Sequence, residues 1–286
     1  MDKGLNDMKQ RTLIITGGSS GIGLATANLF ASQGYTVYEL SRHGQSHDGI
    51  KHIDCDVTSV EACQQAVSAI DQEISTSGGV GAWNAVTLVS NAGMGISGAV
   101  EFSKPHDIRR QFDVNFFGAV NISQAVLPYM RKAAEKTETG TAGGRGRIIF
   151  VSSMMAIFAL PFQAFYSASK FAIDGYALAL KNEVRPFGIK VCCLLPGDVK
   201  TGFTDARKKD TEGIDVYPQM AHAVETMEHD EQNGISPERM AQKVLSLAKS
   251  SNPELLSTVG WMYKAYFILN RFVPTSWAYK IISWMY

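Results

Sequence analysis

The sequence has few cysteines, no excess of either charge and no long apolar run. Its four cysteines among 286 residues show no spacing typical of metal ligands, which predicts reduced, buried thiols and no metal site. The 27 basic and 27 acidic residues balance, so the composition gives no indication of a nucleic-acid partner.

The N-terminal segment also lacks a targeting signal. Residues 1–11 are polar and contain no apolar stretch of the kind found in secretory signals. No apolar run in the chain reaches the roughly 18–20 residues that a membrane-spanning helix needs. These absences predict a cytoplasmic protein, and its length allows a substantial core.

Short apolar runs alternate with helix-like segments, which is the pattern of repeated βαβ units and a parallel sheet. Strands are predicted at Thr12–Thr16, Thr36–Leu40, Ile50–Ile53, Ala85–Ser90, Arg147–Ser152 and Lys190–Leu195, with a last one within Leu255–Val259. Helices are predicted near Gly21–Gln33, Val60–Ser75, Asp107–Met130 (with a break), Phe162–Arg185 and Pro237–Lys249. The fold class is therefore α/β, with one doubly wound, Rossmann-type parallel sheet flanked by helices.

Three segments interrupt this alternation, and they set the predicted domain organisation: an extension over 1–11, a Rossmann-type domain over 12–252 and an extension over 253–286. Residues 132–146 are polar and glycine-rich and are predicted to form a mobile loop. Residues 202–235 follow the sixth strand, where either a substrate lid or a disordered surface loop fits the composition.

The extension over 253–286 is predicted to be a helical appendage rich in aromatic residues. After Glu254 it contains no acidic residue, only Lys264, Arg271 and Lys280 among many rings. The rings either cover the substrate lobe, form a subunit contact or rest on a membrane surface.

A glycine-rich turn follows the first predicted strand and precedes the first predicted helix. Its sequence is Thr16-Gly17-Gly18-Ser19-Ser20-Gly21-Ile22-Gly23. A strand, a glycine turn and a helix form the context of a dinucleotide site, because glycines let the backbone approach a pyrophosphate and the helix N-terminus offers free N–H groups. The spacing Gly-x3-Gly-x-Gly differs from the common Gly-x-Gly-x-x-Gly. The motif therefore indicates a dinucleotide site through its position between a strand and a helix rather than through its spacing.

Tyr166 and Lys170 are the second informative feature. Residues four apart lie on one face of a helix, so the phenol and the ammonium are expected to be neighbours. A nearby cation favours the phenolate and would lower the tyrosine pKa from about 10 toward neutrality, where general acid–base catalysis works best.

In order and spacing, these motifs resemble the short-chain dehydrogenase/reductase family, together with Asn91-Ala92-Gly93, Asn115, Ser153 and Pro196-Gly197. The resemblance covers about residues 11–202, and Leu160–Ala172 further resembles the hydroxysteroid and retinol dehydrogenase branch. It implies hydride transfer between a nicotinamide cofactor and a carbonyl or alcohol carbon. One departure is Ser90, where the family usually has a second asparagine before Asn91.

The resemblance also assigns catalytic roles. Tyr166 would donate the proton in reduction and accept it in oxidation. Lys170 would stabilise the phenolate and hydrogen-bond the nicotinamide ribose, and Ser153 would hold the substrate oxygen. Asn115 matches the position thought to kink a helix and hold a relay water, although a helix-interrupting asparagine without a catalytic role is equally consistent with the sequence.

The same resemblance gives a cofactor site and a preference for NADP(H) over NAD(H). The acidic residue that NAD-dependent members carry after the second strand is replaced by Ser41, and Arg42 can bind a 2′-phosphate. Ser20 stands where many NADP-dependent relatives carry a basic residue, so the preference is expected to be modest. The predicted cofactor-binding residues are Gly17, Ser19, Ser20, Gly21, Ile22, Gly23, Ser41, Arg42, Asp56, Val57, Asn91, Ala92, Gly93, Tyr166, Lys170, Pro196, Gly197, Val199 and Thr201.

Methionine and aromatic residues near Tyr166 indicate a bulky apolar substrate, such as a steroid, a retinoid or a similar lipid. The predicted substrate-binding residues are Ser153, Met155, Phe158, Tyr166 and Phe203, with Met94, Met154, Leu160 and Phe162 as further candidates. A β-ketoacyl thioester reductase and a catalytically silent NADP(H)-sensing protein remain alternatives. The resemblance implies a homodimer or homotetramer built on the helices near 108–130 and 162–185.

Overall fold

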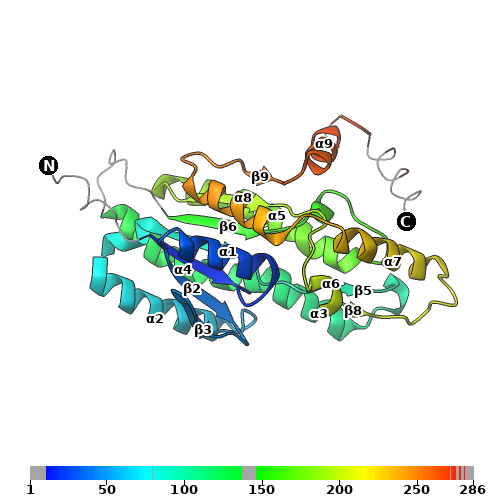
Figure 1. Ribbon diagram of the computed structural model, residues 1–286, viewed down its shortest axis with the longest axis horizontal. Coiled ribbons are helices and arrows are strands. Elements are labelled where there is room, and N and C mark those ends of the chain that lie inside the picture. Colours follow the sequence, from blue (N-terminus) through cyan, green and yellow to red (C-terminus); the bar gives the residue numbers. More distant parts are fainter. Residues whose placement is uncertain are drawn as a thin grey trace.

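The computed structural model describes residues 11–78, 80–136, 146–270 and 272–274, together with Trp277 and Lys280. A seven-stranded, all-parallel sheet in the order β3-β2-β1-β4-β6-β7-β9 forms its centre, with helices on both faces (Figure 1). The strands of this sheet are β1 (Thr12–Thr16), β2 (Thr36–Ser41), β3 (Ile50–Asp54), β4 (Val86–Ser90), β6 (Arg147–Val151), β7 (Lys190–Leu194) and β9 (Leu256–Ser257). The predicted α/β class with a Rossmann-type parallel sheet is confirmed.

Successive residues of the central strands face the two helical layers in turn, as side chains of a pleated strand do. On β1, Ile14 packs in one core while Leu13 and Ile15 pack in the other. The adjacent cysteines of β7 divide in the same way, with Cys193 in the first core and Cys192 in the second. Both faces of the strand are buried, which explains why these segments read as continuous apolar runs.

The helices that cover the sheet lie close to the predicted positions. They are α1 (Gly21–Ser32), α2 (Val60–Gly78), α3 (Pro105–Phe112), α4 (Gly118–Glu135), α5 (Ala164–Glu183) and α8 (Pro237–Lys249). α1 and α8 contribute to the second core, whereas α2, α4 and α5 contribute to the first. Short 3₁₀ turns connect several elements: η1 (Val80–Ala85), η2 (Val100–Phe102), η4 (Met154–Ala156) and η5 (Arg185–Phe187).

The break predicted within Asp107–Met130 is present, but it is a π-helical turn rather than a gap. α3 continues through η3 (Asp113–Phe117) into α4, which extends to Glu135. The predicted loop 132–146 therefore begins too early, because residues 132–135 are helical. Residues 137–145 lie outside the described part of the chain.

Residues 202–235 and the segment after β9 both contain regular secondary structure. Residues 203–232 contain α6 (Phe203–Ala206), β8 (Lys208–Lys209) and α7 (Gln219–Gln232), and β8 pairs with β5 (Ile96–Ser97). A disordered loop at 202–235 is therefore wrong, because α7 is a regular helix. After β9 the chain forms α9 (Trp261–Leu269), which lies at the edge of the molecule in Figure 1.

No helix within the described residues is both long enough and apolar enough to cross a bilayer. Within the same residues, no group of His, Cys, Asp and Glu side chains is arranged to hold a metal ion.

Candidate active site

A cavity of about 1380 Å³ lies at the carboxyl edge of the sheet, where the strand order reverses between β1 and β4. Open parallel sheets bind ligands at this point, because the loops after neighbouring strands diverge there. The walls come from the loops after the strands, from α5, from the segment 202–235 and from α9. Glycine-rich backbone lines one part of the cavity and apolar side chains line another.

The structure brings nearly all predicted cofactor residues to this cavity. Those that line it are Gly17, Ser19, Ser20, Gly21, Ile22, Ser41, Arg42, Asp56, Val57, Asn91, Ala92, Gly93, Tyr166, Lys170, Pro196, Gly197, Val199 and Thr201. Gly23 does not line it. A Cβ on Gly23 would lie only 2.1 Å from the carbonyl oxygen of Gly17, so this glycine lets α1 pack against the turn.

The glycine turn is held in place by the strand next to it. Asn91, after β4, donates side-chain hydrogen bonds to the carbonyl oxygens of Thr16 (3.1 Å) and Gly17 (3.0 Å). Gly17 has a φ of +64°, and a Cβ there would lie 2.9 Å from the Cα of Ala92. The turn is therefore a fixed, glycine-rich backbone at the N-terminus of α1, which fits the pyrophosphate of a dinucleotide.

Arg42, directly after β2, and Asp56, shortly after β3, both line the cavity. Burial opposes ionisation of Asp56, but hydrogen bonds from Thr58 and the charges of Arg42 and Arg110 hold its pKa below the ordinary value. The acidic residue of β2 is Glu39, which does not line the cavity and contacts His52 at 2.5 Å. The charged residue that lines the cavity directly after β2 is thus Arg42, a guanidinium.

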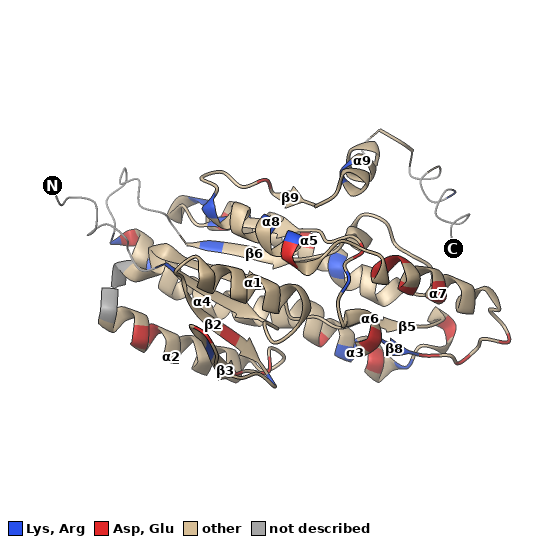
Figure 2. Ribbon diagram, viewed as in Figure 1, with Lys and Arg blue, Asp and Glu red and all other residues tan. Residues whose placement is uncertain are grey.

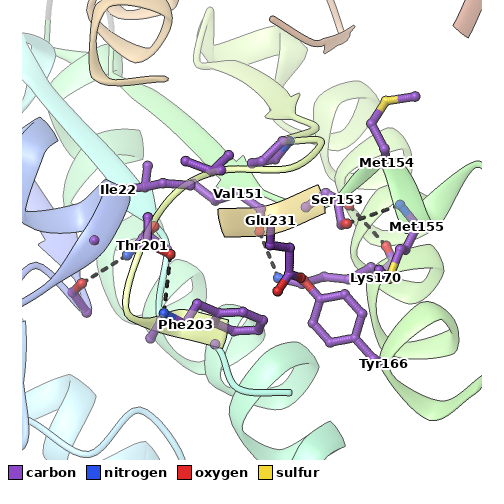
Figure 3. A pocket seen from close by; sticks show the side chains of 18 of the residues that line it. Ile22, Val151, Ser153, Met154, Met155, Tyr166, Lys170, Thr201, Phe203 and Glu231 are labelled. Carbon is purple, nitrogen blue, oxygen red and sulfur yellow. Dashed lines mark hydrogen bonds between the residues drawn. The ribbon is translucent and has the colours of Figure 1, made fainter. Parts of the chain in front are cut away.

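Ser153, Tyr166 and Lys170 converge beside the apolar part of the cavity (Figure 3). Lys170 lies one turn after Tyr166 on α5, and its Nζ is 5.7 Å from the centre of the Tyr166 ring. The same Nζ donates a hydrogen bond of 3.0 Å to the carbonyl oxygen of Val151, which fixes the ammonium at the end of β6. Ser153 Oγ accepts a 3.0 Å hydrogen bond from the N–H of Met155 and so is oriented by η4.

The electrostatics of this group differ from the sequence-based expectation. Burial raises the pKa of Tyr166 to about 12, while Ser153 and Arg207 act in the opposite direction. Burial also lowers the pKa of Lys170 to about 8, against the charge of Asp174. Tyr166 is therefore a protonated phenol at neutral pH, whereas the sequence predicted that Lys170 lowers its pKa.

Asn115 lies behind the cavity rather than in its wall. It is 1% exposed, sits in η3 and pairs with both backbone groups of Met94, at 2.8 and 3.0 Å. Its amide also donates to Ser169 Oγ (3.0 Å), and that hydroxyl donates to the carbonyl oxygen of Tyr166 (2.7 Å). The π-turn thus ties the loop after β4 to the helix that carries Tyr166.

The segment 202–235 adds a buried ion pair near the phenol that the sequence did not reveal. Glu231 on α7 accepts hydrogen bonds from Arg207 (2.5 Å) and Thr204 (2.7 Å), which joins α7 to α6. Glu231 lines the cavity and Phe203 packs 5.9 Å from the Tyr166 ring, and both extend toward Tyr166 in Figure 3. An acidic side chain in a polar segment has no distinguishing pattern, so no signal in the sequence identifies Glu231.

α9 closes the other side of the cavity. The Tyr263 hydroxyl donates to the carboxylate of Asp198 and accepts a 3.0 Å hydrogen bond from the Asp198 N–H. Its ring covers Gly197, where a Cβ would lie 2.3 Å from a ring carbon. α9 is therefore attached to the loop after β7. The aromatic composition of 253–286 is the one feature of the sequence that indicates a contact of this kind.

The predicted substrate residues Met155, Phe158 and Phe203 line the cavity, as do Met154 and Leu160. Met94 and Phe162 do not line it. α9 and the residues after it add apolar wall that the sequence did not specify: Met262, Tyr263, Tyr266, Leu269 and Val273.

Comparison with known proteins places this geometry in context. The sequence profile described as short chain dehydrogenase matches residues 11–212. The chain is 38% identical over 268 residues to the 3-ketodihydrosphingosine reductase of Bacteroides thetaiotaomicron, covering 92% of this chain and 93% of that protein.

Solved structures share the fold at low sequence identity. A short-chain dehydrogenase from Streptomyces avermitilis superposes with a TM-score of 0.78 at 22% identity, covering 96% of each chain. A short chain dehydrogenase from Burkholderia cenocepacia in complex with NADP gives a TM-score of 0.68 at 21% identity, covering 91% of this chain and 92% of that one.

Proposed function

The chain belongs to the short-chain dehydrogenase/reductase family of nicotinamide-dependent oxidoreductases that act on CH–OH groups, and we propose that it interconverts a carbonyl and an alcohol on a bulky apolar lipid with NADP(H). The first candidate substrate is a long-chain ketone of the 3-ketodihydrosphingosine type, named by the 38%-identical relative. Steroids and retinoids are the other lipid classes that an apolar cavity of this size suits.

The observation that carries this proposal is the continuity of one cavity. Its glycine-rich part fits a dinucleotide, the Ser153–Tyr166–Lys170 group follows, and a wall of methionine, leucine and aromatic side chains completes it. An apolar wall beside the catalytic group favours a substrate whose reacting carbon carries a long or bulky apolar substituent.

Each catalytic side chain has a role that its position supports. When bound, the nicotinamide cofactor supplies or accepts the hydride. Tyr166 holds the proton that the developing alkoxide needs, and its raised pKa keeps that proton in place at neutral pH. Ser153, oriented by the Met155 N–H, is placed to donate to the same oxygen, and the buried Lys170 is placed to stabilise the tyrosinate that remains.

A substrate panel tests the proposal. Purified protein is mixed with NADPH and, in separate reactions, with 3-ketodihydrosphingosine, a ketosteroid, retinal and acetoacetyl thioester, and loss of NADPH absorbance is followed. We expect turnover of at least one of the three lipid carbonyls. If protein that still binds NADPH turns over only the thioester, the lipid proposal is contradicted in favour of a β-ketoacyl thioester reductase, and if it turns over none of the four, a sensing role gains support.

The NADP(H) preference gives a separate prediction. Replacing Arg42 with alanine should weaken NADPH binding about tenfold to a hundredfold, because a hydrogen bond to a charged group contributes about 1.5–3 kcal/mol. NADH binding should change little, since NADH lacks the 2′-phosphate. Titration of cofactor fluorescence measures both, with Arg239→Ala on α8 as the control. Equal losses for the two cofactors would remove the basis for the preference.

The thioester alternative receives less support from the lid. A carrier protein's phosphate would need free cations near the cavity, and Lys200, Arg207, Lys208 and Lys209 are the candidates in sequence. Arg207 is buried against Glu231, Lys208 pairs with Asp107 and Lys209 pairs with Glu228. Three of the four cations are therefore already engaged by acidic side chains.

A homodimer or homotetramer is proposed on the surfaces of α4 and α5. Phe117 (49%), Phe171 (44%) and Leu178 (42%) are exposed large apolar side chains in η3 and α5. Such groups favour a subunit contact along these helices. Light scattering of the purified protein tests this, and a monomer at micromolar concentration would rule it out.

A further inference from the structure

The outward side of α9 and the described residues after it expose an unusual amount of apolar surface. The exposed fractions are 84% for Trp261, 56% for Ile268, 80% for Phe272 and 69% for Trp277. Large aromatic side chains are seldom left this exposed in soluble monomers, and a cluster of them marks an interaction surface.

The inward side of the same helix forms part of the candidate active site. Tyr263 and Tyr266 line the cavity, and Tyr263 is bonded to Asp198 in the loop after β7. Leu269 belongs to both sides, because it lines the cavity and is 51% exposed. α9 is therefore a wall with the cavity on one side and the exposed apolar surface on the other, and the cavity reaches that surface at Leu269.

The charges of this segment favour one kind of partner. Residues 255–286 contain Lys264, Arg271 and Lys280 and no acidic side chain, although the whole chain is neutral. Lys264 is exposed on α9 itself, and Figure 2 shows no acidic residue on α9. A helix with exposed tryptophan, phenylalanine and isoleucine side chains and only basic charges fits the headgroup region of an anionic lipid bilayer.

We propose that α9, together with Phe272 and Trp277, docks on an anionic membrane surface, so that the cavity exchanges its apolar ligand with the bilayer at Leu269. The docking half of the proposal is argued only from the exposed side chains and the charges, whereas its ligand-exchange half rests on the proposed lipid oxidoreductase function. The hydrogen bonds between Tyr263 and Asp198 would then connect the membrane-facing helix α9 to the loop after β7.

Vesicle flotation of the full chain tests the docking half without any turnover. The probes are vesicles of phosphatidylcholine alone and vesicles that also contain phosphatidylglycerol. We expect wild-type protein to float mainly with the anionic vesicles. The variant Trp261→Ser/Ile268→Ser/Phe272→Ser should lose at least about tenfold in binding, since each exposed apolar side chain contributes through its burial. Lys264→Gln should lose about fivefold on anionic vesicles only.

The matched control is Val100→Ser/Ile214→Ser/Val216→Ser, which removes three exposed apolar side chains (57%, 38% and 61%) away from α9. It should float like wild type. NADPH affinity checks that every variant is folded. The proposal is overturned if wild type fails to bind either vesicle, or if the α9 variant floats like wild type. It is also overturned if the α9 variant instead changes the oligomeric state in light scattering, because this surface is then a subunit contact.

A vesicle-embedded substrate tests the ligand-exchange half. The α9 variant should lose turnover of a lipid ketone in anionic vesicles, yet retain turnover of the same ketone in detergent micelles. Equal losses in both media would overturn the exchange at α9. No turnover by wild type in either medium would contradict the proposed function and leave the flotation result standing.

Discussion

Replacing Tyr166 with phenylalanine is expected to lower kcat by at least about 10²–10⁴-fold, the usual contribution of a positioned proton donor. The variant keeps the ring that packs against Phe203 and loses only the hydroxyl beside Ser153. NADPH should still bind, because the cradle at Gly17 and Asn91 is untouched. Initial rates with a turned-over ketone and a cofactor titration measure the two effects separately.

Tyr176→Phe on the same helix is the matched control. The Tyr176 hydroxyl lies 2.9 Å from Ser123 Oγ, and the residue does not line the cavity. Its loss should leave kcat within about twofold. Normal turnover by Tyr166→Phe would remove the assignment of Tyr166 as the proton donor. Equal losses in both variants would mean that any hydroxyl removed from α5 disturbs the helix.

Replacing Gly23 with alanine is expected to damage both stability and cofactor binding. Its Cβ would lie 2.1 Å from the carbonyl oxygen of Gly17 and 2.6 Å from Asn91 Nδ2, so backbone must move. Overpacking of this kind costs about 1–3 kcal/mol of unfolding free energy. The displaced atoms also form the pyrophosphate cradle, so NADPH affinity should fall together with the melting temperature. Thermal unfolding with and without NADPH measures both.

Gly175→Ala is the control for that prediction. Gly175 lies within α5, and a Cβ there meets no atom within 4 Å. Alanine at this position should be neutral or stabilise the helix by about 0.5–1 kcal/mol. If Gly23→Ala melts like wild type and binds NADPH normally, the backbone of the glycine turn can accommodate the added methyl group, and the prediction is wrong.

The sheet was largely predictable because its strands are buried on both faces. β1, β6 and β7 each contain a short apolar run directly after their first residue, and each begins at its predicted residue. The short pair β5–β8 was missed, since two-residue strands carry no periodic signal. The helix α7 was also missed, because its polar composition resembles that of a surface loop and its burial depends on the tertiary contacts of Met220, Met227 and Glu231.

The cavity-lining residues that belong to short local motifs could be predicted from the sequence. The glycine turn, Arg42 and Tyr166 with Lys170 each depend on short-range spacing that a single sequence preserves. The pKa of Tyr166 was not predictable, because burial depends on which distant segments cover the phenol. Glu231 and Tyr263 reach the cavity from elements far along the chain, and only the fold brings them there.

The placement of the four cysteines has a practical consequence. Cys63, Cys192 and Cys193 are buried in the two cores and do not line the cavity, whereas Cys55 is buried in the first core and also lines the cavity, so Cys55 is the one native thiol that a reagent entering the cavity can meet. In a Cys55→Ser variant, single cysteines introduced at exposed positions of α9 and α7 would react alone. A fluorophore or spin label can then be attached to each wall of the cavity, and the separation of the two walls can be followed directly in solution.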